Sequence, residues 1–216
     1  FAARSQARWH AAHEAGLFAE EIVAVAVPQR KGDPVMVEID EHPRPGTDER
    51  ALAGLRGVNG PDRSVTAGNA SGINDGAAAL LLGDEAAAKR AAPLARVVCM
   101  AAAGVPPRIM GIGPVPATRK ALALAGLDIG QMDVIELNEA FASQGLASLR
   151  ELGLPDDADH VNPNGGAIAM GHPLGMSGAR LVMTAAYQLR RTGGRYALCT
   201  MCVGVGQGVA IIIERT

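Results

Sequence analysis

Two side chains that can move protons, Cys202 and His172, stand in glycine-rich segments near the end of the 216-residue chain. Cys202 opens residues 202–208, where alternate glycines leave backbone N–H groups uncovered by side chains. A thiol beside free N–H groups, with an imidazole on a neighbouring segment, is suited to carbanion and acyl chemistry. Neither remaining cysteine, Cys99 or Cys199, is placed to be an acyl-carrying nucleophile.

His172 lies within residues 162–180, which are rich in glycine and lead into a predicted helix. A helix N-terminus favours the neutral form of a nearby imidazole and stabilises anionic partners. A single histidine is more often structural than catalytic. Here the glycines remove bulk that a packed core histidine would not need removed, so we favour a catalytic role for His172.

Asn138 follows the apolar run 134–137 and comes directly before a predicted helix. Ligands of α/β proteins bind at the carboxyl ends of strands, so this position suits a binding or catalytic amide. The alternative is that Asn138 only caps the helix. The segment taken alone leaves both interpretations open.

The spacing of Cys199 and Cys202 also fits a redox or zinc pair. Residues three apart on a strand point to opposite faces, and a second cysteine pair that could complete a zinc site is missing. We therefore predict no metal site. The glycines of residues 204–208 either only permit a tight hairpin or place the N–H of Gly204 beside the thiol as an oxyanion site.

Composition narrows the class of protein. Apolar residues make up 48% of the chain, the formal net charge is −2, and Lys and Arg form no block. These values predict a real core and argue against a nucleic-acid partner. Apolar runs fall far short of the roughly 20 residues of a membrane helix. Three cysteines, an odd number, favour the reducing cytoplasm over a disulfide framework.

The order of predicted elements indicates an α/β fold. Helical spacing covers residues 1–21 as a surface helix, and residues 28–63 form a surface excursion with one alternating run at 35–39. Strands are expected at 76–83 (buried), 95–101, 134–137, 196–203 and 209–214, and helices at 84–92, 117–125, 139–152 and 175–191. The last two strands, joined by a short glycine-rich turn, should form an antiparallel hairpin.

Four segments closely resemble, in the same order, motifs of the thiolases, the acyl-CoA C-acyltransferases. They are residues 65–76, 138–141, 165–180 and 202–208. The resemblance spans the whole chain but only about the second half of a thiolase. It implies the thiolase fold, with a C-terminal βαβαβαββ-type domain. The implied divisions are residues 1–71 for part of the coenzyme A-binding loop domain, 72–92 for the last strand and helix of the N-terminal domain, and 93–216 for the C-terminal domain.

The resemblance also implies a role for each candidate residue. Cys202 would remove a proton from the α-carbon of the incoming acyl-CoA, or return one to the leaving enolate. His172 would activate the nucleophile and help bind the thioester oxygen, and Asn138 would hold a water in that oxyanion site. Gly204 would offer its N–H to a second oxyanion.

Coenzyme A is implied as a substrate rather than a bound cofactor, with Ser71 and Arg44 resembling its contacts. A thiolase takes its nucleophilic cysteine from its N-terminal half. Cys99 cannot substitute, because its segment resembles the first buried strand of the C-terminal domain. Because the chain begins at Phe1, we expect a truncated or proteolysed piece whose partner is that N-terminal half. The complete protein would be a homo-oligomer, a dimer or a tetramer.

Within the family, residues 136–139, 162–164 and 199–206 resemble the 3-oxoadipyl-CoA (β-ketoadipyl-CoA) thiolases of aromatic degradation. The expected reaction is therefore Claisen cleavage or condensation of 3-oxoadipyl-CoA or acetoacetyl-CoA. The alternative, from a different class of function, is a non-catalytic coenzyme A-binding or assembly module that keeps the fold without the nucleophile.

Overall fold

A computed structural model describes all residues, Phe1–Thr216. Its centre is a four-stranded sheet of order β3-β6-β5-β4, formed by β3 (Ala95–Gly104), β4 (Val134–Leu137), β5 (Tyr196–Val203) and β6 (Gln207–Arg215). β4 and β5 are parallel, whereas β6 is antiparallel to both of its neighbours. The predicted β5–β6 hairpin is confirmed. Because β4 and β5 are parallel, their carboxyl ends lie at the same end of the sheet.

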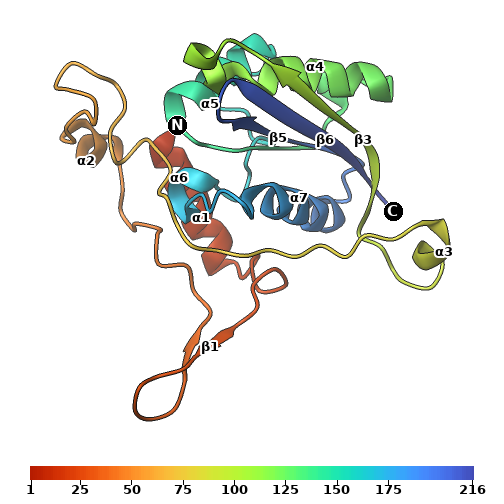
Figure 1. Ribbon diagram of the computed structural model, residues 1–216, viewed down its shortest axis with the longest axis horizontal. Helices are drawn as coiled ribbons and strands as arrows, with labels where there is room; N and C mark the ends of the chain where they lie inside the picture. The colour runs from red at the N-terminus through yellow and green to blue at the C-terminus, as the bar shows by residue number, and fades with distance from the viewer.

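Helices cover both faces of this sheet (Figure 1). α4 (Pro114–Ala125) and α5 (Ala142–Glu151) lie on one side, and α7 (Ser177–Thr192) lies on the other. Because successive side chains along β4 and β5 point to opposite faces of the sheet, the apolar core is divided between these two sides. Ile135, Leu137 and Leu198 pack on the α4 side, whereas Val134 and Cys199 pack on the α7 side.

The helix boundaries follow from local chemistry. α4 has Pro114 at its first position, where a missing N–H costs nothing, and ends at Gly126 in the left-handed conformation (φ 66°). α7 likewise ends at Gly193 with φ 75°. Two 3₁₀ turns flank α4: η1 (Pro107–Ile112) lies between β3 and α4, and η2 (Ile129–Gln131) lies between α4 and β4.

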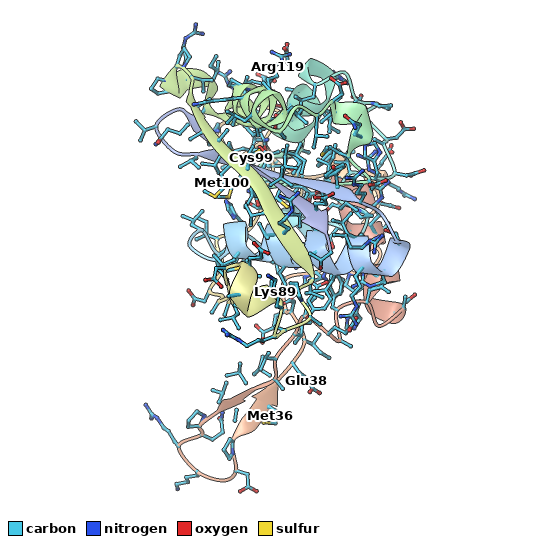
Figure 2. The ribbon with its side chains drawn as sticks, turned by 90° about the vertical axis from the view of Figure 1, so that its right-hand side faces the viewer. Met36, Glu38, Lys89, Cys99, Met100 and Arg119 are labelled. Carbon is cyan, nitrogen blue, oxygen red and sulfur yellow. The ribbon has the colours of Figure 1, made fainter.

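The first part of the chain wraps around this layered body. α1 (Ala2–Glu14) packs against the short α6 (Ala167–Met170), and their side-by-side placement is visible in Figure 1. β1 (Val25–Val27) and β2 (Val35–Val37) form a hairpin that extends away from the body (Figure 2). Two short helices follow, α2 (Glu49–Ala53) and α3 (Glu85–Ala88). No helix of the structure combines the length and the apolar character required to cross a bilayer.

The buried strand predicted at residues 76–83 is wrong. This segment has no strand partner and runs over the surface, with Leu81 fully exposed. Apolar composition predicted burial, but a strand also needs a neighbour to satisfy its N–H and C=O groups, and none lies beside it. The helix predicted next, at 84–92, is only the single turn of α3.

Three further expectations need correction. β3 is an edge strand rather than a buried one, with Cys99 half-buried and Met100 68% exposed (Figure 2). The helix at residues 1–21 ends at Glu14, and Trp9 buries its ring, so α1 is only partly a surface helix. α5 begins three residues later than predicted, at Ala142.

Candidate active site

Asn138 and His172, distant in sequence, lie in contact just beyond the carboxyl end of β4. The backbone N–H of Asn138 donates to the carbonyl of Thr200 (2.9 Å), which extends the β4–β5 ladder by one bond. Its side-chain Nδ2 lies 3.2 Å from Nε2 of His172. The alternative role as a helix cap is wrong, because α5 begins at Ala142 with Phe141 as its N-cap residue.

His172 is held in place by its own backbone. Its N–H donates to the carbonyl of Gly72 (3.0 Å) and lies 3.3 Å from Oδ1 of Asn74. Gly171, directly before it, has φ 94°, and a Cβ there would stand 2.3 Å from that Oδ1. A side chain at Gly171 would thus be strained by both its backbone conformation and Asn74, while the wider expectation that the glycines remove bulk around a catalytic His172 stays a prediction.

Ser177, at the start of α7, lies within hydrogen-bond distance of Nδ1 of His172. The hydroxyl of Ser177 donates its one hydrogen to the carbonyl of Pro173 (2.9 Å). Nδ1 of His172 lies 2.6 Å from that hydroxyl oxygen, and we assign Nδ1 as the donor of this bond because the hydroxyl hydrogen is used by Pro173. A neutral imidazole with a proton on Nδ1 carries a lone pair on Nε2, which accepts the hydrogen bond from Asn138. Sequence reasoning missed Ser177.

The surroundings keep this imidazole neutral. Burial lowers the pKa of His172, and the positive charge of Arg180 lowers it further. On the other side of the pair, Oδ1 of Asn138 is buried and accepts no hydrogen bond from the protein. A proton acceptor, Nε2, and a free amide carbonyl thus lie together. This arrangement suits proton transfer and the binding of a water or a ligand donor.

Cys202 lies near the carboxyl end of β5, beside the end of β4, with its side chain buried. Burial raises the pKa of its thiol, so the group is held protonated at neutral pH. The thiol forms no hydrogen bond with His172 or Asn138. Gly204 lies in the exposed turn between β5 and β6, where Val205 and Gly206 have positive φ. The roles of Cys202 and Gly204 therefore stay predictions.

Cys199 points away from Cys202, as strand alternation predicts. It packs among apolar residues on the α7 side, where its thiol donates to the carbonyl of Leu181 (3.4 Å). No cluster of three His, Cys, Asp or Glu side chains with the arrangement of a metal site occurs in the structure. The three cysteines are free.

Ser71 lies on a segment bonded to the chain just after Asn138, and Arg44 lies on a segment bonded to α1. The N–H of Ser71 donates to the carbonyl of Ala140 (3.0 Å), two residues after Asn138. Arg44 is exposed, and its backbone N–H donates to Oε1 of Gln6 (3.0 Å) on α1. Both residues are thus anchored by backbone bonds that leave their side chains free. Whether these side chains contact coenzyme A stays a prediction.

Comparison with known proteins decides the family. Residues 91–215 match the model of the thiolase C-terminal domain, and residues 1–86 match that of the thiolase N-terminal domain. The chain belongs to the thiolase family. The thiolase resemblance and the expected fold are therefore confirmed, whereas the three predicted domain divisions stay predictions.

Curated thiolases are similar over the whole chain. It is 66% identical to a beta-ketoadipyl-CoA thiolase of Pseudomonas aeruginosa and 62% identical to a 3-oxoadipyl-CoA/3-oxo-5,6-dehydrosuberyl-CoA thiolase of Escherichia coli. A Bacillus anthracis acetyl-CoA acetyltransferase structure matches with a TM-score of 0.96 at 44% identity. A human mitochondrial 3-ketoacyl-CoA thiolase solved in complex with CoA matches with a TM-score of 0.90 at 46% identity. The chain is covered completely in each match but spans only 53–54% of these relatives.

Asn162, a second residue that sequence reasoning missed, holds the end of β4 in this thiolase chain. Its side chain bonds both the N–H and the carbonyl of Leu137, each at 2.8 Å, and so replaces a neighbouring strand. Its backbone has φ 46°, a conformation that asparagine tolerates better than most residues. The turn-forming sequence at residues 162–165 was the available signal.

Glu139, directly after Asn138, joins three separate segments. Its carboxylate accepts hydrogen bonds from Ser5 on α1 (2.5 Å), from Asn162 (2.8 Å) and from the N–H of Ile168 on α6 (3.1 Å). Each of these donors is neutral, and the carboxylate is fully buried. The thiolase segment 138–141 therefore serves two purposes, since Asn138 faces His172 while Glu139 fastens the chain around it.

Proposed function

We propose that this chain is the C-terminal portion of a thiolase that transfers an acyl group between a 3-oxoacyl-CoA and coenzyme A. The observation that carries the proposal is the hydrogen-bonded series Asn138–His172–Ser177, which leaves Nε2 of a neutral imidazole as a proton acceptor. The names of the relatives, which are thiolases or an acetyl-CoA acetyltransferase, support this class of activity.

The proposed cleavage uses a nucleophilic cysteine supplied by the remainder of a thiolase chain. His172 takes the proton of that thiol, and the thiolate attacks the 3-oxo carbonyl of the substrate. The resulting imidazolium helps to stabilise the thioester oxygen, with a water held by Asn138. Collapse of the adduct breaks the bond between the α- and β-carbons.

The enolate of acetyl-CoA leaves that adduct and must gain a proton. We assign this proton to Cys202, whose buried thiol is protonated at neutral pH. The N–H of Gly204 would bind a second oxyanion, the oxygen of the adduct that becomes the carbonyl oxygen of the acyl-cysteine. The Cys202 thiolate then takes the proton of the coenzyme A thiol, whose sulfur attacks the acyl-cysteine; the nucleophilic cysteine leaves as a thiolate and regains its proton from the imidazolium of His172. Condensation runs the same steps in reverse, with Cys202 as the base.

The substrate we propose is 3-oxoadipyl-CoA, because the curated relatives with 60–66% identity carry the names beta-ketoadipyl-CoA or 3-oxoadipyl-CoA thiolase. Ser71 and Arg44 would contact coenzyme A. We further propose a cytoplasmic homo-oligomer. The three unpaired cysteines support the compartment.

The test is turnover by a completed enzyme. The chain is joined to the N-terminal segment of a relative, and cleavage of 3-oxoadipyl-CoA and acetoacetyl-CoA is measured. We expect activity that prefers 3-oxoadipyl-CoA, and a loss of at least about 10²-fold in kcat for Cys202→Ala. Cys99→Ala, at a cysteine far from the proposed chemistry on the edge strand, is the matched control. Binding of coenzyme A without turnover in the completed protein would instead support a non-catalytic coenzyme A-binding module.

A further inference from the structure

Two buried connections join β4 to α7. The first runs from Asn138 through His172 to Ser177. The second is an ion pair between Nη1 of Arg180 and Oε2 of Glu136, at 2.8 Å. Glu136 precedes Asn138 by two residues and Arg180 follows Ser177 by three, so each element presents both of its contributions on one face. The ion pair therefore lies beside the candidate site and forms a second connection between β4 and α7.

Packing alone does not require a charged pair at this place. The apolar residues Val134, Leu181 and Leu189 already fasten α7 to the sheet. Glu136 and Arg180 are both buried, and removing two charges from water costs several kcal/mol, which their attraction often fails to repay. Oε1 of Glu136 even lacks a hydrogen-bond partner. An apolar pair would serve stability at least as well.

We propose that Glu136 and Arg180 are positioning residues, whose ion pair holds the first turn of α7 against the end of β4 and so keeps Nε2 of His172 facing Asn138. The proposal rests on the function proposed above for His172. A displacement of about 1 Å at such a site costs about 10² in rate. Loss of the pair should therefore lower kcat while KM for the acyl-CoA stays unchanged.

The pair also sets the charge next to the imidazole. Arg180 lowers the pKa of His172, after the larger effect of burial, and Glu136 offsets the charge of Arg180. Replacing Glu136 by Gln should lower the pKa of His172 further, whereas replacing Arg180 by Met should raise it. Other titratable groups that face the pair are Glu21, Asp40, Glu139 and Cys199. None of them is altered by these substitutions.

The experiment compares Glu136→Gln, Arg180→Lys and Arg180→Met in the completed enzyme at pH 8. Asp156→Asn is the matched control, because it breaks an exposed pair with Arg150 of similar length, 2.7 Å. We expect kcat to fall about 10²-fold for Glu136→Gln and Arg180→Met, less for Arg180→Lys, and not at all for the control. NMR titration should show a lower pKa of His172 in Glu136→Gln and a higher one in Arg180→Met.

The double variant Glu136→Leu/Arg180→Met separates positioning from folding. Its apolar side chains can restore packing, so we expect a Tm at or above that of the parent with kcat still about 10²-fold lower. Recovery of kcat together with Tm would overturn the proposal, as would an unchanged pKa of His172 in both Glu136→Gln and Arg180→Met. A parent enzyme without turnover would contradict the proposed function instead, while the NMR titration would still test the pair.

Discussion

Residues 93–216 and residues 22–92 fold by different means. The two largest apolar clusters lie entirely within the first of these regions. Most of the exposed large apolar side chains lie in the second, on the β1–β2 hairpin and around residues 80–82. The difference teaches that apolar content alone does not produce burial in this chain. A segment is buried where a sheet neighbour or a covering helix exists for it, and otherwise it follows the surface.

The largest expected effect contrasts the two regions with the same substitution. Leu198→Ala removes a fully buried side chain from the central strand β5 and should lower the free energy of unfolding by about 2–5 kcal/mol. Leu81→Ala, at a fully exposed leucine, should change it by less than about 0.5 kcal/mol. Urea unfolding measures both. Equal losses would erase the contrast between the regions.

The next effect concerns pH. Burial raises the pKa of Glu136 to about 7 against the opposing influence of Arg180, from an ordinary value of 4.5. Between these values the folded protein holds a proton that the unfolded chain has released, so this carboxyl contributes stability that is lost as pH rises from 4.5 to 7. The contribution is on the order of 3 kcal/mol.

Glu136→Gln should remove that contribution, so the variant's stability should decline less than the parent's between pH 4.5 and 7. The lowered pKa of His172 acts in the opposite sense below its ordinary value, and the further lowering expected in Glu136→Gln changes the variant's profile in the same direction as the loss of the Glu136 contribution. Glu38→Gln, on the exposed hairpin, serves as the control from the other region. Parallel profiles for parent and Glu136→Gln, from thermal unfolding at each pH, would contradict the assignment.

A smaller effect is expected for two asparagines that each fasten a turn. Asn162→Ala deletes three buried hydrogen bonds at the end of β4 and should cost about 1–3 kcal/mol. Asn69→Ala deletes two bonds to residues 64 and 66, near the surface, and should cost less than about 1 kcal/mol. Chemical denaturation compares them. A larger cost at Asn69 would indicate that the surface region is held more firmly than its contacts suggest.

The smallest effect belongs to the hairpin. Val25 and Val37 are cross-strand partners, and both are exposed. Val25→Thr should therefore change the unfolding free energy by no more than about 0.5 kcal/mol. Amide hydrogen exchange should be fast in β1 and β2 and slow in β5 and β6. Slow exchange throughout the hairpin would show that contacts other than the β1–β2 pairing protect it.

Local patterns in the sequence were enough to predict part of this structure. The β5–β6 hairpin, β4 and the course of α7 follow from alternation, periodicity and glycine turns, all of which are properties of neighbouring residues. The strand predicted at residues 76–83 failed because burial depends on a partner strand that the segment's own composition cannot reveal. The same limit explains why Cys99 was placed on a buried strand rather than on the edge.

In the candidate site, too, features set by neighbouring residues were predicted, whereas features set by partners distant in sequence were not. Asn138 and His172 were singled out by their residue types and glycine surroundings, and the structure brings them together. Ser177 was missed because its role comes from hydrogen bonds of its hydroxyl to His172 and Pro173, which the spacing of residues in the sequence does not show. Asn162 and Glu136 were missed because their partners lie 25 and 44 residues away in sequence, so no local pattern could indicate them.

The most direct test of the account is the ¹⁵N spectrum of the His172 ring near neutral pH, with long-range couplings to identify each nitrogen. We predict a proton on Nδ1, none on Nε2, and a changed Nε2 signal in Asn138→Ala. A ring protonated on Nε2 or on both nitrogens, or a spectrum that does not respond to Asn138→Ala, would contradict the assignment of His172 as the resting proton acceptor of the site.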